Sequence, residues 1–166
     1  MNRLDRQLSE CALDMRIAAR TSVPVLISAN PEDAMGVAAA IAGTTDHGHV
    51  GAFVVLAAAN IDELAGSMTN AEQGRGDHPR TVIVRDIDAI DRQQQDVVME
   101  TIRVRCRTAA FPSWRLITTT SVPLYDRVVA GAFDPRLFYC LNAIHIVMKP
   151  EADAFAMSEA PPDQVL

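Results

Sequence analysis

The segment VPVLISANPEDAMG, Val23 to Gly36, decides the fold class of the chain. Its apolar start, Val23–Ile27, predicts a buried strand, and the alanine-rich stretch Met35–Ala42 predicts a helix. A strand, a loop and a helix in this order are the arrangement in which backbone amides bind phosphate. The expected loop, however, has no glycine before Gly36 and no lysine. The segment therefore predicts the scaffold of a nucleotide site without its usual phosphate ligands.

Four more apolar runs predict strands, and helical patterns alternate with them. The expected strands are Ala52–Leu56, Thr81–Val84, Arg115–Thr119 and Ala143–Met148, and the other expected helices are 3–20, 62–68, 88–108 and 124–130. Apolar runs without alternation are typical of parallel strands that helices cover on both faces. Strands that alternate with helices favour right-handed crossovers. The sequence predicts an α/β fold, a three-layer α/β/α sandwich around a five-stranded parallel sheet.

Composition limits the classes of function. The chain has 166 residues, of which 49% are hydrophobic and 22% charged, as expected for one globular domain. A net charge of −6 argues against general nucleic-acid binding. No apolar run approaches the roughly 20 residues that span a bilayer, and the polar start resembles no signal peptide. We expect a cytoplasmic protein without membrane contact, in which residues 1–148 form a single core and the acidic, proline-containing segment 149–166 is a flexible tail.

The order of the motifs resembles the AAA+ domain of sigma-54-dependent transcription activators. TVIVRDIDAIDRQQQDVVMETI, from Thr81, is similar to the family's strand, acidic pair and helix, and WRLITTTSVPLYDRVVAGAFDPRLFYCLNAIHI, from Trp114, is similar to the segment that follows. Identities with the family include Ile87, Gln95, Arg115, Ile117, Thr120, Leu124, Gly131, Phe133, Leu137, Tyr139, Leu141, Asn142 and Ile146. The resemblance covers residues 1–148. It implies a P-loop NTPase core with strand order 5-1-4-3-2 and without a lid domain.

The resemblance also implies that the phosphate-binding motif, Walker A, is degenerate. The family's glycine-rich loop is replaced by ANPEDAMG, in which Pro31 removes an amide donor and Met35 stands where the lysine should be. Glu32 and Asp33 add negative charge where phosphates would bind. No neighbouring lysine can substitute, because among the 15 basic residues only Lys149 is a lysine.

The other catalytic positions of the family are changed as well. The acidic pair of Walker B, which should bind magnesium, reads Arg85-Asp86, and the polar sensor residue is Ser121. The two arginines that reach a neighbouring subunit correspond to Asp134 and Cys140. We therefore expect a pseudo-ATPase with no catalytic residue, no metal site and no cofactor. The expected remnant of the nucleotide pocket consists of Ser28, Asn30, Asp33, Met35, Gly36, Arg85, Asp86 and Ser121.

Expected partners follow from what the resemblance includes and lacks. The family's sigma-contacting loop should lie between Met68 and Thr81, where only a short polar connector stands, so no direct contact with sigma-54 is expected. Direct DNA binding is not expected either. The segment that corresponds to the family's subunit interface predicts docking to a second copy or to another protein, through Phe133, Asp134, Arg136, Phe138 and Tyr139. The chain would then be a protein-interaction or regulatory module in transcription.

Two alternative functions remain open on the sequence. The first is a sensor of ATP, ADP or a small ligand that keeps a remodelled pocket at Ser28–Gly36, with Arg85 as the phosphate-binding cation. The second is a Mg²⁺-dependent phosphohydrolase that uses Asp86 and Asp88, with Asp91 nearby. Arg85 opposes a metal at this position, and acidic residues also suit the start of a helix.

Overall fold

The computed structural model describes residues 3–43, 53–67, 81–108 and 114–148 of the chain. It contains one parallel sheet in the order β2-β3-β4-β1-β5. The strands are β1 (Val25–Ser28), β2 (Phe53–Ala57), β3 (Thr81–Arg85), β4 (Arg115–Thr120) and β5 (Ile144–Val147). The α/β class and the strand order expected from the sequence are confirmed.

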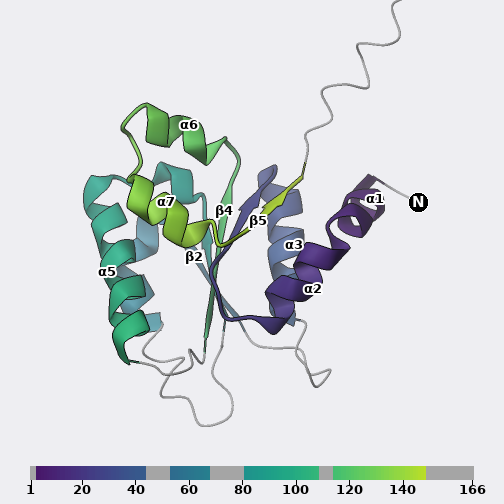
Figure 1. Ribbon diagram of the computed structural model, residues 1–166, viewed down its shortest axis with the longest axis horizontal. Helices are drawn as coiled ribbons and strands as arrows, with labels where there is room; N and C mark the ends of the chain where they lie inside the picture. The colour runs from purple at the N-terminus through teal and green to yellow at the C-terminus, as the bar shows by residue number, and fades with distance from the viewer. Residues whose placement is uncertain (1–2, 44–52, 68–80, 109–113, 149–166) are drawn as a thin grey trace, which may run out of the picture.

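Helices cover both faces of the sheet (Figure 1). One face carries α1 (Arg3–Glu10), α2 (Ala12–Arg20) and α3 (Pro31–Gly43). The other carries the short 3-10 helices η1 (Ala58–Glu63) and η2 (Ile87–Ala89), with α5 (Arg92–Thr108), α6 (Leu124–Val129) and α7 (Pro135–Leu141). The connection from β1 to β2 runs toward one edge of the sheet, whereas the later connections run toward the other edge. Because each connection is right-handed, α3 lies on the opposite face of the sheet from α5–α7.

The sheet separates two apolar cores. Leu26, Val84 and Leu116 point toward α5–α7, whereas Ile27, Ile83 and Ile117 point toward α2 and α3. All six side chains are fully buried. Successive side chains of a strand face opposite sides of the sheet, so each apolar run supplies both cores. This is the reason the strands show no polar alternation in the sequence.

Several helix boundaries differ from the expectation. Residues 3–20 form two helices rather than one, because the chain turns at Cys11, which has φ −92° and ψ 2°. The helix expected at 62–68 begins as η1 at Ala58. Helix α7 had not been expected from the sequence, although its residues were expected to lie at an interface. The largest difference is at α3, which begins at Pro31 rather than at Met35.

Some expectations fall on other parts of the chain. The tail 149–166 and the whole connector between Met68 and Thr81 lie outside the described residues, so the domain boundary at 148 stays a prediction. Within the described ranges, no helix has the length and apolar character needed to cross a membrane.

Candidate functional site

The expected pocket residues lie around the carboxyl ends of three adjacent strands. Ser28 ends β1 opposite Thr120 of β4, and Arg85 ends β3 on the other side of β4. Neighbouring strands are about 4.8 Å apart, so Ser28 and Arg85 lie about 10 Å apart across β4. Ligands of open parallel sheets bind at this edge. The sheet therefore gathers the expected pocket residues at the edge where a ligand would bind.

The connection between β1 and α3 is too short to surround a phosphate. Only Ala29 and Asn30 separate the strand from the helix. The Ala29 N–H donates to the carbonyl of Thr120 (3.1 Å), and Asn30 caps the helix by accepting from the Asp33 N–H at Oδ1 (2.9 Å). Proline suits the first helical position, where its missing N–H is not needed. The loop expected at Ser28–Gly36 is thus corrected to a two-residue connection followed by helix.

Two of the backbone amides at the start of α3 are used within the chain. Pro31 has no N–H, the Asp33 N–H is bonded to Asn30, and the Ala34 N–H donates to the Asn30 carbonyl (2.9 Å). The side-chain amide of Asn30 also donates to the Asp33 carboxylate. Glu32 and Asp33 in the first turn oppose the attraction that a helix N-terminus has for anions. The Asp33 and Ala34 amides therefore have their hydrogen-bond partners within the chain.

Met35 and Gly36 lie in the second turn of α3. Met35 is half-buried and packs against the core on the α2–α3 face. Gly36 is exposed, and open space surrounds the position of an added Cβ. A methionine in the core cannot replace the charge of a phosphate-binding lysine.

Arg85 and Asp86 lie at the end of β3. The Arg85 guanidinium is 4.0 Å from the Asp86 carboxylate, and both side chains are substantially exposed. Asp86 has a left-handed backbone (φ 56°), and its N–H donates to Oγ1 of Thr119 (3.3 Å). Aspartate tolerates this conformation better than most residues. A cation and an anion are therefore paired where two carboxylates would hold a metal.

The remaining polar residues of this edge have separate partners. Oγ1 of Thr120 donates to Asp88 (2.9 Å), and Asp91 forms a reciprocal cap with Gln94 at the start of α5 (2.8 and 2.9 Å). Ser121 is exposed, and Oγ of Ser28 lies 2.8 Å from Nε2 of His145. In the part of the chain that the structure describes, no three His, Cys, Asp or Glu residues could together hold a metal ion.

Asp134 has a buried structural position at the start of α7. It is only 5% exposed, and its carboxylate accepts from the N–H groups of Arg136 (2.7 Å) and Leu137 (3.4 Å). The guanidinium groups of Arg136 (2.9 Å) and Arg92 (3.3 Å) also contact it. The hydrogen bond from the Arg136 side chain is the main reason that the pKa of Asp134 falls to about 2. Asp134 is a helix cap with two arginine partners.

Gln95 joins α5 to the turn before α7. It is 1% exposed; Oε1 accepts from the Asp134 N–H (2.8 Å), and Nε2 donates to the carbonyls of Ala132 (3.0 Å) and Ile90 (3.3 Å). We had not assigned this residue to the site from the sequence. The sequence offered one signal, the identity of Gln95 with the family. Its burial became known only from the structure.

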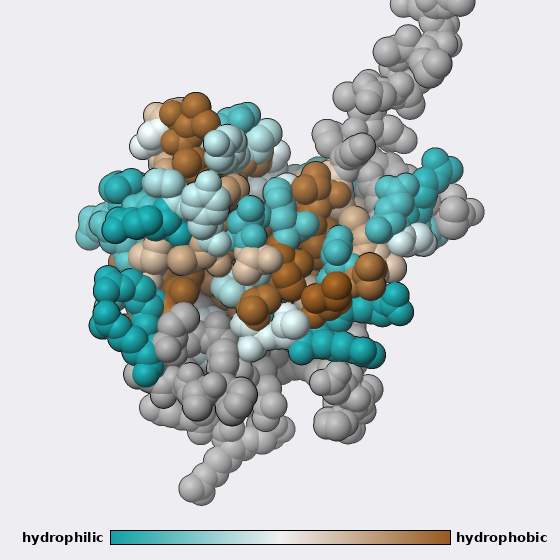
Figure 2. Space-filling view, viewed as in Figure 1, coloured by the Kyte–Doolittle hydropathy of each residue, from teal (hydrophilic) through white to brown (hydrophobic). Residues whose placement is uncertain are grey.

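The expected interface residues divide by burial. Phe133 and Phe138 are buried together with Asp134, whereas the Arg136 side chain is 76% exposed and Tyr139 is 68% exposed. The Phe138 ring contacts both Tyr139 (centroids 5.4 Å apart) and Tyr125 of α6 (5.7 Å). We call the exposed set of Tyr125, Val129, Arg136 and Tyr139 the α6–α7 surface. Figure 2 shows its apolar part over α6.

Comparison with protein-family models and with curated proteins gives no match to this sequence. Solved structures do match. NtrX from Brucella abortus in complex with ATP has a TM-score of 0.63 and 16% identity, over 86% of this chain and 35% of that one. The P-loop NTPase domain of the sigma-54 transport activator from E. coli has a TM-score of 0.62 and 16% identity, over 91% and 99%. The replication initiator DnaA, bound to AMPPCP and single-stranded DNA, has a TM-score of 0.54 and 10% identity, over 90% and 47%.

The fold is that of an AAA+ P-loop NTPase domain. The parallel sheet and its strand order agree with these neighbours, and the agreement extends over nearly the whole described chain. The chain spans about a third of the length of NtrX and almost all of the E. coli domain.

Proposed function

We propose that the chain is an AAA+ module of the sigma-54 activator type that does not hydrolyse ATP and acts by binding a protein. The observation that carries the proposal is the start of α3 at Pro31. A phosphate-binding loop needs free amides and a lysine, whereas this connection has two residues, a proline and acidic side chains. The same change removes both the space and the charge that phosphates require.

The other family positions support the same proposal. Phosphoryl transfer depends almost entirely on positioned charges and a metal ion. Here Arg85 is paired with Asp86, and Asp134 is a buried cap where the family has an arginine. Cys140, at the second arginine position, is exposed, and its thiol cannot supply the positive charge of a guanidinium. The described positions that correspond to the family's acidic pair and arginines thus lack the charges used in phosphoryl transfer, while the apolar cores and the sheet are retained.

Protein binding is proposed for the α6–α7 surface. Exposed tyrosines and arginines are the residues that most often dominate the energy of interfaces. Tyr139 and Tyr125 lie on either side of buried Phe138, so their rings are held by packing before any partner binds. A partner would be a second copy of the chain or another AAA+ domain.

ATP is expected to leave the thermal stability unchanged. A ligand that binds the folded state at one hundred times its Kd stabilises it by about 2.7 kcal/mol, a shift of roughly 5 to 10 °C for a chain of this size. With 1 mM ATP or ADP and Mg²⁺, we expect the Tm to change by less than about 1 °C. Differential scanning calorimetry with and without nucleotide measures this, and phosphate release should equal the buffer blank.

The control is an active sigma-54 activator domain measured in the same buffer, which must show the shift. A rise of several degrees for this chain would contradict the loss of nucleotide binding. It would favour the sensor alternative if Arg85→Ala abolished the rise. Phosphate release that disappeared in Asp86→Ala would favour the hydrolase alternative.

Substitution of Tyr139 is expected to weaken association. Tyr139→Ala removes an exposed aromatic contact, and such residues cost about 2 kcal/mol or more in an interface, roughly thirtyfold in Kd. Sedimentation equilibrium of the chain, alone and mixed with AAA+ domains from the same cell, measures the change. Leu13→Ala removes a similarly exposed apolar side chain on the opposite face and should leave the Kd unchanged. Equal Kd values for Tyr139→Ala and wild type would exclude the α6–α7 surface.

A further inference from the structure

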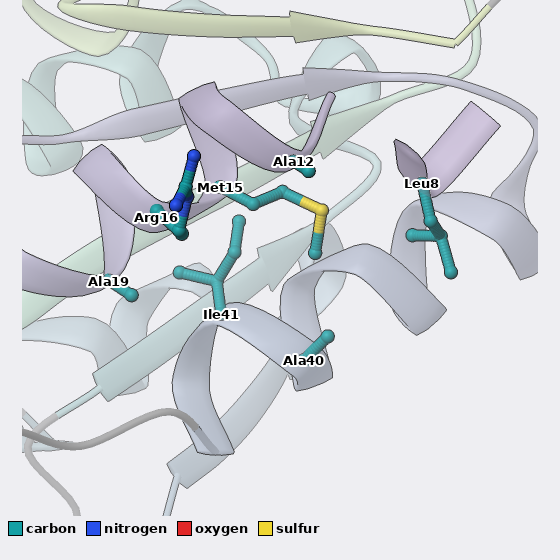
Figure 3. Close-up of a pocket in the computed structure, with 7 residues that line it drawn as sticks. All are labelled: Leu8, Ala12, Met15, Arg16, Ala19, Ala40 and Ile41. Atoms are coloured by element: carbon teal, nitrogen blue, oxygen red, sulfur yellow. The ribbon is translucent and has the colours of Figure 1, made fainter. Parts of the chain in front are cut away.

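A cavity lies on the opposite side of the sheet from the α6–α7 surface. It has a volume of about 230 Å³ and opens between α1–α2 and α3. Its lining is apolar except for one guanidinium, and consists of Leu8, Ala12, Met15, Arg16, Ala19, Ala40 and Ile41. Figure 3 shows these side chains between α1–α2 and the later turns of α3. Because Ala40 and Ile41 are in the last turns of α3, the cavity is separate from the remnant nucleotide pocket at its start.

The end of β5 lies against the α1–α2 junction, at one end of the helix pair that lines this cavity. Met148, the last described residue, is buried in the same apolar cluster as Leu8, Cys11 and Met15. Sγ of Cys11 is 3.9 Å from the carbonyl oxygen of Val147, and the Met148 N–H donates to Ser28 (2.9 Å). The chain therefore passes to residue 149 next to the α1–α2 junction, which also contributes Leu8 and Ala12 to the cavity.

The sequence that follows carries an apolar group of suitable size. The segment reads PEADAFAM from Pro150, and Phe155 is seven residues beyond Met148. Seven extended residues reach about 25 Å, which exceeds the length of α2, about 13 Å for nine residues. A cavity of about 150 Å³ with an apolar lining can already bind benzene. The cavity is thus within reach and large enough for a phenyl ring.

At the cavity itself the charges are complementary, whereas Glu10 and Asp14 lie near Cys11 at the α1–α2 junction. Arg16 is exposed at the cavity, and its neighbour Arg20 is on the same helix. Glu151 and Asp153 shortly precede Phe155. We propose that the segment after β5 folds back along α2, with the Phe155 ring in this cavity and its acidic residues facing Arg16. The contact would cover α2 and leave the α6–α7 surface accessible, and it does not depend on the proposed function.

Methyl NMR of the full chain tests the contact. An aromatic ring in the cavity shifts the Met15 and Ile41 methyl resonances upfield, so Phe155→Ala should move both downfield. The methyl of Met99, on the other face of the sheet, should not move. The control substitution Val165→Ala in the same segment should leave all three unchanged. Unchanged Met15 and Ile41 resonances in Phe155→Ala would refute the proposal. Since Phe155 lies outside the described cores, the variant is expected to fold.

Dilution and proteolysis show whether the ring in the cavity comes from the same chain or from a second copy. Shifts that persist on dilution support a contact within one chain, whereas shifts that vanish would mean that a second copy supplies the ring, which overturns the proposal. Cleavage by a glutamate-specific protease after Glu151 tracks the undocked population and should be about tenfold faster in Phe155→Ala. Ala40→Leu, which fills the cavity, and Arg16→Glu should act in the same direction. Cleavage at the wild-type rate in all three variants would contradict docking.

Discussion

Replacement of Gln95 by alanine is expected to lower the free energy of unfolding by about 3 kcal/mol. The substitution removes three hydrogen bonds at a fully buried position and leaves the Asp134 N–H without its acceptor. Each buried polar group that loses its partner costs about 1 to 3 kcal/mol. For a chain of this size, the expected decrease in Tm is about 10 °C. Urea denaturation, with calorimetry as a second measurement, gives both values.

Gln93→Ala is the matched control for Gln95→Ala. Gln93 is on the same helix but exposed, so this substitution should change the free energy by no more than about 0.5 kcal/mol. Both variants gain the same helix propensity, which leaves burial as the difference between them. Equal stability of the two variants would show that Gln95 does not hold α5 against the turn before α7.

Substitution of Asp134 is also expected to lower the free energy of unfolding. Asp134→Ala removes the cap of α7 and the partner of Arg92 and Arg136, and we expect a loss of about 2 kcal/mol. Asparagine also caps helices well. Asp134→Asn therefore keeps the cap and removes the charge, so its loss should be smaller. Denaturant unfolding at neutral pH measures both, with the exposed Asp126→Asn of α6 as the control for a lost surface charge.

The Asp134 charge also sets a pH dependence. Its pKa in the folded chain is about 2, below the ordinary aspartate value of 3.8, so the folded state favours the ionised form. The resulting stability is complete above the unfolded pKa and is lost as the pH falls toward about 2. The difference in unfolding free energy between wild type and Asp134→Asn should therefore narrow between pH 4 and pH 2. A difference that stays constant over this range would contradict an ionised, arginine-paired carboxylate.

The strands could be predicted from the sequence because their signal is local. A short apolar run that must supply two cores shows the same pattern wherever the strand lies in the sheet, as Val25–Ser28 and Thr81–Arg85 illustrate. The order of the strands is not local. It came from the resemblance in the segments from Thr81 to Ile146, and the sheet confirms it.

The candidate site was less predictable, because it depends on where backbone groups find partners. Proline and acidic residues in ANPEDAMG indicated a lost phosphate site, but not that Pro31 begins the helix with Asn30 as its cap. The segment Phe133–Tyr139 indicated an interface. Whether each side chain points outward depends on α5 and α6, which bury Phe133 and Phe138 and leave Tyr139 exposed.

The sequence by itself determined the α/β class and the five strands. These properties belong to residue types and their local spacing. Only the tertiary structure decided that Asp134 is a buried cap, that Gln95 joins α5 to the turn before α7, and that a cavity lies between α1–α2 and α3. Each of these depends on groups distant in the sequence, whose hydrogen bonds and packing exist only after the sheet brings the helices together.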